Sequence, residues 1–95
     1  MKLSQDYIYI QYKLNNVLVK RKVTSPKQIK TLKALVRRGY KGVTALELSN
    51  TWALRLADYV FQLRRGFDLN IETVREEHEG GWHGRYVLIT NVEIL

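Results

Sequence analysis

The sequence predicts a small α+β domain in which a β-hairpin is followed by three helices and then by a second β-hairpin. Aromatic and β-branched residues dominate before residue 25, apolar residues recur every three or four positions between 26 and 65, and apolar and polar residues alternate after residue 70. The 95 residues, 45% of them hydrophobic, suffice for one core and are too few for two domains. We therefore expect residues 1–95 to form a single domain, with residues 1–24 as an N-terminal hairpin extension.

The first hairpin is predicted from two runs rich in Tyr, Ile and Val, at residues 7–12 and 17–23. Asn15 and Asn16 lie between the runs, and asparagine tolerates the positive φ angles that a tight hairpin turn requires.

The first helix is predicted over residues 26–38. Ser25 is a typical N-cap residue, and Pro26 suits the first helical position because its missing N–H would have no partner there. Gly39 and Gly42 end the helix. Its predicted core stripe is Ile29, Leu32, Leu35 and Val36.

The second and third helices are separated by the polar break at residues 49–51. Thr44 and Glu47 have the spacing of a capping box, so the second helix should begin at Ala45. The third helix is predicted over residues 53–65, with Gly66 marking its exit. Its predicted core stripe is Ala53, Leu56, Ala57, Val60 and Leu63.

The second hairpin is predicted from strands at residues 71–75 and 85–90, joined by a glycine-rich loop over residues 76–84. The tail, residues 91–95, adds an edge strand or covers the core.

Three helices followed by a hairpin is the element order of a winged helix, in which helices two and three form a helix-turn-helix and the hairpin is the wing. The Thr44-Ala45-Leu46-Glu47 start, the run at residues 56–67, the Ile71-Glu72-Thr73 strand and the closing residues 85–88 resemble the winged helix-turn-helix domains of small phage-encoded proteins. This resemblance implies a DNA-binding module of phage origin that regulates transcription or recombination in a bacterial cytoplasm.

The net charge of +7 indicates a polyanionic partner, and its distribution is uneven. Up to Leu48 there are eleven cationic residues against two acids, and from Ser49 onward there are five against seven. The basic surface therefore belongs to the first half of the chain. Its predicted phosphate contacts are Lys20, Arg21, Lys22, Lys27 and Lys30.

The third helix is the predicted DNA-recognition helix. Its Arg and Gln side chains suit the edges of bases in a major groove, and Asp can accept from a cytosine amino group. Leu54, Tyr59 and Phe61 would be exposed together on it, which favours a partner over an ordinary solvated face. Its predicted DNA-binding residues are Thr51, Leu54, Arg55, Asp58, Tyr59 and Gln62, with Arg64 and Arg65 at its end. The alternative for its charged side chains is local ion pairing, and for the two arginines also pairing with the helix dipole.

Exposed aromatic residues support a second hypothesis, a protein-binding module that inhibits or redirects a host protein. Tyr7 and Tyr9 on the first strand and Trp82 in the acidic wing are its predicted contacts. The tyrosines also suit a homodimer, which would bind a palindromic site.

Other function classes find little support in the sequence. The chain has no cysteine, and no nucleophile, base and orienting acid can be combined from its motifs, so we expect neither an enzyme nor a cofactor. His78 and His83 do not have a recognised metal-ligand spacing, so no metal is expected. No apolar run is long enough to span a membrane, and no signal peptide is apparent, which favours a cytoplasmic protein.

Overall fold

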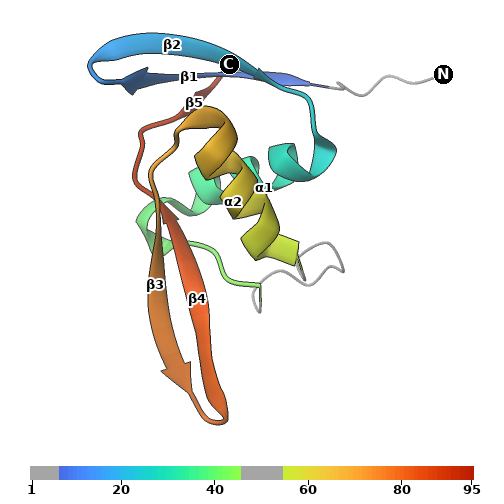
Figure 1. The fold of residues 1–95 in the computed structure, drawn as a ribbon, viewed down its shortest axis with the longest axis vertical. Helices are drawn as coiled ribbons and strands as arrows, with labels where there is room; N and C mark the ends of the chain where they lie inside the picture. Colours follow the sequence, from blue (N-terminus) through green and yellow to red (C-terminus); the bar gives the residue numbers. More distant parts are fainter. Residues whose placement is uncertain (1–6, 46–54) are drawn as a thin grey trace, which may run out of the picture.

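The computed structural model describes residues 7–45 and 55–95. In these residues the helices lie between a three-stranded sheet and a long hairpin that projects away from them (Figure 1). The element order is β1 (Ile8–Leu14), β2 (Val17–Val23), α1 (Pro26–Arg38), the 3₁₀ turn η1 (Gly39–Lys41), α2 (Leu56–Phe67), β3 (Ile71–His78), β4 (Gly81–Leu88) and β5 (Glu93–Ile94).

The N-terminal hairpin confirms the sequence-based prediction. β1 and β2 pair antiparallel, with Leu14 opposite Val17, so the connection is the two residues Asn15 and Asn16. Their φ angles are 53° and 66°, the left-handed conformation that matches the twist of a two-residue hairpin. On the other edge of β1, the tail pairs as β5, which confirms the edge-strand alternative for residues 91–95.

Helix α1 has the predicted bounds. The backbone N–H of Gln28 donates to Ser25 Oγ at 3.5 Å, Pro26 opens the helix, and Gly39 follows it with φ 55°. Leu32 and Leu35 are fully buried, while Ile29 and Val36 pack against the core from its margin.

Helix α2 differs from the prediction at its end. It runs through Gly66 to Phe67, and Asp68 then adopts the left-handed conformation, with φ 56°. The prediction that Gly66 is the exit is wrong because Phe67 is buried and its carbonyl accepts the Tyr12 hydroxyl at 2.6 Å. Ala57 is exposed and is not part of the core stripe.

The predicted second helix and the turn after it fall mainly on residues 46–54, outside the described residues, as does the predicted start of the third helix at Ala53. Within residues 7–45 and 55–95 the structure contains two α-helices. Three helices are therefore not confirmed.

The wing hairpin is longer than predicted. β3 and β4 pair without interruption from Ile71 opposite Leu88 to His78 opposite Gly81, and only Glu79 and Gly80 remain between them. The predicted loop over residues 76–84 is therefore wrong. Cross-strand contacts, such as that of Glu76 with Arg85, stabilise these polar residues as strands.

The base of the wing is joined to the region after η1. Val43 and Tyr86 exchange both backbone hydrogen bonds, each 2.9 Å, which adds a third short strand segment beside β4. Gly42 precedes this bridge with φ 71° and lies against Tyr86 and Val87.

One hydrophobic core connects the two ends of the molecule. The inner face of the sheet, the buried sides of both helices and the base of the wing all contribute to it. Its main members are Ile8, Ile10, Tyr12, Val23, Leu32, Leu35, Val43, Leu56, Val60, Leu63, Phe67, Leu69, Ile71, Leu88 and Val92.

Candidate nucleic-acid interface

Helix α2 presents one continuous polar and aromatic face to solvent. Leu56, Val60 and Leu63 are fully buried on its core side. Because successive residues of a helix are rotated by about 100°, the opposite side is formed by a separate set of residues. This set, which we term the α2 outer face, consists of Arg55, Asp58, Phe61, Gln62 and Arg65, all exposed.

An ion pair occupies the start of this face. Arg55 donates from Nε and from a terminal guanidinium nitrogen to the same Asp58 oxygen, at 3.1 and 2.9 Å. The hydrogen bond with Asp58 raises the pKa of Arg55 above its already high ordinary value, so the guanidinium is always charged. Both side chains are exposed, and an exposed pair of this kind contributes little to stability. A ligand can therefore exchange these contacts at low cost.

Gln62 is held by helix α1. Gln28 Nε2 donates to Gln62 Oε1 at 2.8 Å, which fixes the Gln62 amide beside the first turn of α1. Gln28 was not among the sequence-based candidates. The available signal was a polar residue on the otherwise apolar side of the predicted first helix.

Phe61 and Arg65 form the end of the outer face. The Phe61 side chain is 54% exposed, and the Arg65 guanidinium lies 5.5 Å from its ring centroid. An exposed phenylalanine one helical turn from an arginine combines apolar and cationic contact in one place. Tyr59 is only half-buried at the side of this face, and Thr51 and Leu54 lie outside the described residues.

Arg64 has a different environment from its neighbour Arg65. Its Nε donates to the Ile71 carbonyl at 2.8 Å, and a terminal nitrogen donates to Thr73 Oγ1 at 2.8 Å. These bonds connect the end of α2 to the start of β3. Arg64 therefore positions the wing relative to α2.

The basic run at residues 20–22 is divided between two sides of the sheet, because successive side chains of a strand alternate. Arg21 lies on the inner side, where it donates to the Gly66 carbonyl at 3.1 Å and packs 5.0 Å from the Phe67 ring centroid. Lys20 and Lys22 lie on the outer side, over the rings of the exposed Tyr9 and Tyr7 respectively.

The tyrosines at and just before β1 are divided in the same way. Tyr7 and Tyr9 are exposed and contact each other edge to face, with ring centroids 5.5 Å apart. Tyr12 is buried, and desolvation raises the pKa of its hydroxyl. The outer sheet face therefore brings together two predicted partner contacts and two predicted phosphate contacts.

Lys27 and Lys30 are both exposed on α1. Lys27 is in the first turn, one residue before Gln28. Lys30 lies about 200° around the helix from Gln28, on the side that is turned away from α2.

The wing contains its own charge network. Glu76 accepts from Arg85 Nε at 2.6 Å and contacts His83 Nε2 at 3.0 Å, and the Arg85 hydrogen bond lowers the pKa of Glu76. Near the tip, Trp82 is 54% exposed and the Arg75 guanidinium lies 4.7 Å from its ring centroid. Among the described residues, no group of three or more potential ligands is placed to hold a metal ion.

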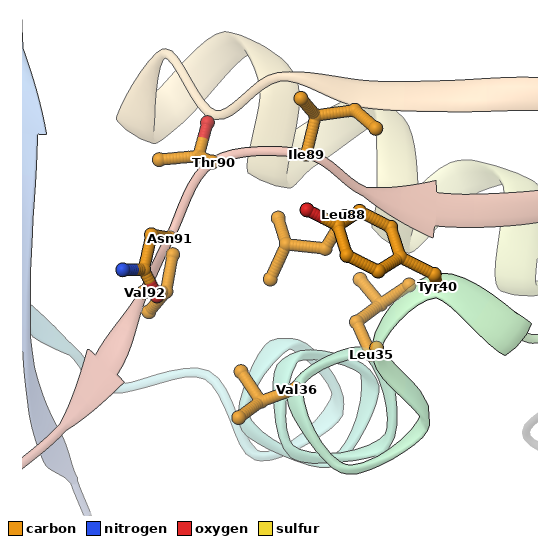
Figure 2. Close-up of a pocket in the computed structure, with 9 residues that line it drawn as sticks. Leu35, Val36, Tyr40, Leu88, Ile89, Thr90, Asn91 and Val92 are labelled. Carbon is orange, nitrogen blue, oxygen red and sulfur yellow. The ribbon is translucent and has the colours of Figure 1, made fainter.

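A cavity of about 370 Å³ lies between the end of α1, η1 and residues 88–92 (Figure 2). Leu35, Val36, Leu88 and Val92 supply apolar walls, and Tyr40, Thr90 and Asn91 supply polar atoms. Its lining carries no carboxylate, imidazole or amine, and Tyr40 supplies its one titratable side chain.

The arrangement of helices, bridging strand segment and projecting hairpin is that of a winged helix. The family model described as "Winged helix domain" matches residues 22–95, and the chain belongs to this family. No curated protein and no solved structure matches the chain. No helix in the described residues has the length and apolar character needed to cross a membrane.

Proposed function

We propose that this winged-helix protein binds double-stranded DNA sequence-specifically by placing α2 in the major groove. The α2 outer face is the observation that carries this proposal. In our proposal the protein is a regulator or architectural factor of a phage or mobile element, acts in the bacterial cytoplasm and has no enzymatic activity.

The side chains of the outer face suit base edges. Arginine can donate two hydrogen bonds to guanine, glutamine can pair with adenine, and aspartate can accept from the cytosine amino group. Phe61 offers apolar contact to a thymine methyl group. An α-helix fits into the major groove, so these side chains can reach base edges from one helix.

The proposal includes phosphate contacts beside the groove. Lys27 directly precedes Gln28, which donates to Gln62 on the α2 outer face, and it remains a predicted phosphate contact. A lysine that neutralises one phosphate contributes roughly one unit to the slope of log K against log salt. Lys20 and Lys22 remain predicted phosphate contacts of this docking, whereas Lys30, also predicted to contact phosphate, lies on the side of α1 turned away from α2.

The test is selection from a pool of random duplexes, followed by affinity measurements on the enriched sequence. Arg55→Ala and Gln62→Ala should each weaken specific binding by about 1–3 kcal/mol, or roughly 5- to 150-fold, without unfolding the protein. Lys13→Ala is the matched control, because it removes an exposed charge from the far hairpin. Unchanged affinity in both α2 variants would reject groove reading by α2, and a palindromic motif would support a homodimer.

A second candidate function, binding of a host protein, is favoured by the exposed Trp82 and Tyr9. Exposed aromatic side chains are typical anchors of protein interfaces. Trp82→Ala or Tyr9→Ala should then abolish co-purification of a specific host protein that the wild type retains. Retention of that protein by both variants would reject this candidate.

A further inference from the structure

All charged side chains of helix α1 are cationic. Among its 13 residues there are five cationic side chains and no acidic one. Solvent-facing helices usually mix charges of both signs. The cationic residues are Lys27, Lys30, Lys33, Arg37 and Arg38.

Three of these cations form a narrow line, which we term the α1 basic stripe: Lys30, Lys33 and Arg37. Their rotations from Gln28 around the helix axis are about 200°, 140° and 180°. Gln28 faces α2, as its hydrogen bond to Gln62 shows. The stripe is therefore on the side of α1 turned away from α2, which crosses in front of α1 in Figure 1.

The stripe is electrostatically unfavourable within its own helix. Lys33 and Arg37 are four residues apart, and like charges at this spacing repel each other on a helix surface. Lys27 adds a cation to the first turn, where the helix dipole favours an anion. Neutralisation by a polyanion would relieve both effects.

The shape of the stripe matches a nucleic-acid backbone. With a rise of about 1.5 Å per residue, its three cations span roughly 10 Å along the helix. A strand of duplex DNA carries one phosphate per about 3.4 Å of axis, so a stripe of this length can contact more than one phosphate. A membrane surface fits less well, because the apolar residues Leu32 and Leu35 are buried and offer nothing to insert.

We propose that the α1 basic stripe binds the phosphate backbone of a second DNA duplex, so that one protein molecule bridges two duplexes. This inference rests on the proposed binding of the first duplex by α2. A straight duplex lying along the α2 outer face does not reach the far side of α1, which is about 10 Å thick. The stripe therefore serves a separate duplex.

The test is a bridging assay with two short duplexes that carry the selected sequence, one attached to beads and one fluorescent and free. Wild-type protein should retain the free duplex on the beads at low salt. Lys33→Gln/Arg37→Gln should reduce this retention by about tenfold or more while keeping its affinity for a single duplex. Lys13→Gln/Arg75→Gln, with the same loss of charge on the hairpin and the wing, should bridge like wild type.

A second measurement excludes unfolding as the cause. The Lys33→Gln/Arg37→Gln variant should have a midpoint of thermal unfolding at least as high as that of wild type at low salt, because it loses like-charge repulsion.

Four outcomes would overturn the inference. Wild type that binds one duplex without retaining a second would reject bridging and leave the proposed function intact. If the Lys33→Gln/Arg37→Gln variant bridges duplexes as well as wild type does, the bridging would be assigned to another surface or to a dimer. If wild type binds vesicles of phosphatidylserine and phosphatidylcholine, and the stripe variant loses this binding but bridges duplexes like wild type, the stripe would be assigned to a membrane. Wild type that binds no duplex would reject the proposed function as well.

Discussion

At the scale of single residues, the partners of a side chain decide its role more than its type does. Tyr9 and Tyr12 belong to the same strand, but Tyr9 is exposed and Tyr12 is buried with its hydroxyl bonded to the Phe67 carbonyl. A buried hydroxyl is stable only with such a partner. The same bond extends α2 past Gly66.

Tyr12→Phe should lower the free energy of unfolding by about 1–3 kcal/mol, because it leaves a buried carbonyl without its donor. Denaturant unfolding measures this, and Tyr9→Phe is the control, with an expected change near zero. Burial raises the pKa of Tyr12 in the folded state, so its contribution to stability is complete below the ordinary tyrosine pKa and is lost as pH rises through the folded-state pKa. Equal stability losses for the two variants would contradict this account of Tyr12.

Alanine substitutions at two glycines are expected to change stability in opposite directions. An added Cβ at Gly42, where φ is 71°, would lie 2.8 Å from the Tyr86 carbonyl oxygen. Gly42→Ala should therefore destabilise the protein by about 1–3 kcal/mol. Gly66→Ala has open space and a helical position, and should stabilise by about 0.5–1 kcal/mol. Thermal unfolding of both variants is the measurement, and a stabilising Gly42→Ala would show that this site is not constrained.

At the scale of elements, the sequence was sufficient to predict turns and helix ends that depend on residues close together in the chain. Asn15 and Asn16 predicted the turn of the first hairpin, and Ser25, Pro26 and Gly39 predicted both ends of α1. The wing was predicted too short, because its polar residues become strand residues only through partners on the facing strand. Likewise, the run at residues 20–22 looked like one basic patch until strand alternation divided it.

The wing network gives a pH-dependent expectation. The pKa of Glu76 is lowered by Arg85, so its contribution to stability is present above the ordinary glutamate pKa and is lost as pH falls through the lowered value. Glu76→Gln should therefore be less stable than wild type at neutral pH, and its stability should fall less on acidification below pH ~5. Denaturant unfolding across this range is the measurement, with Glu72→Gln as control. If the free energy of unfolding fell equally with decreasing pH in wild type and in Glu76→Gln, the expectation would be contradicted.

At the scale of the whole molecule, the sequence predicted the winged-helix class and the basic character of the first half. It could not predict that the cations would be distributed over several surfaces. Lys20 and Lys22 lie on the outer sheet face, Arg21 and Arg64 form internal contacts, and Lys33 lies on the far side of α1. Such a distribution depends on packing between distant elements, which periodicity alone does not specify.

The central claim, that α2 reads a major groove, is tested most directly by dimethyl sulfate protection on the selected duplex. This reagent methylates guanine N7 in the major groove and adenine N3 in the minor groove, so it distinguishes the two. We predict protection of guanine N7 by wild type and its loss with Arg55→Ala/Gln62→Ala. Protection confined to adenine N3, or guanine protection that persists in the double variant, would contradict the claim.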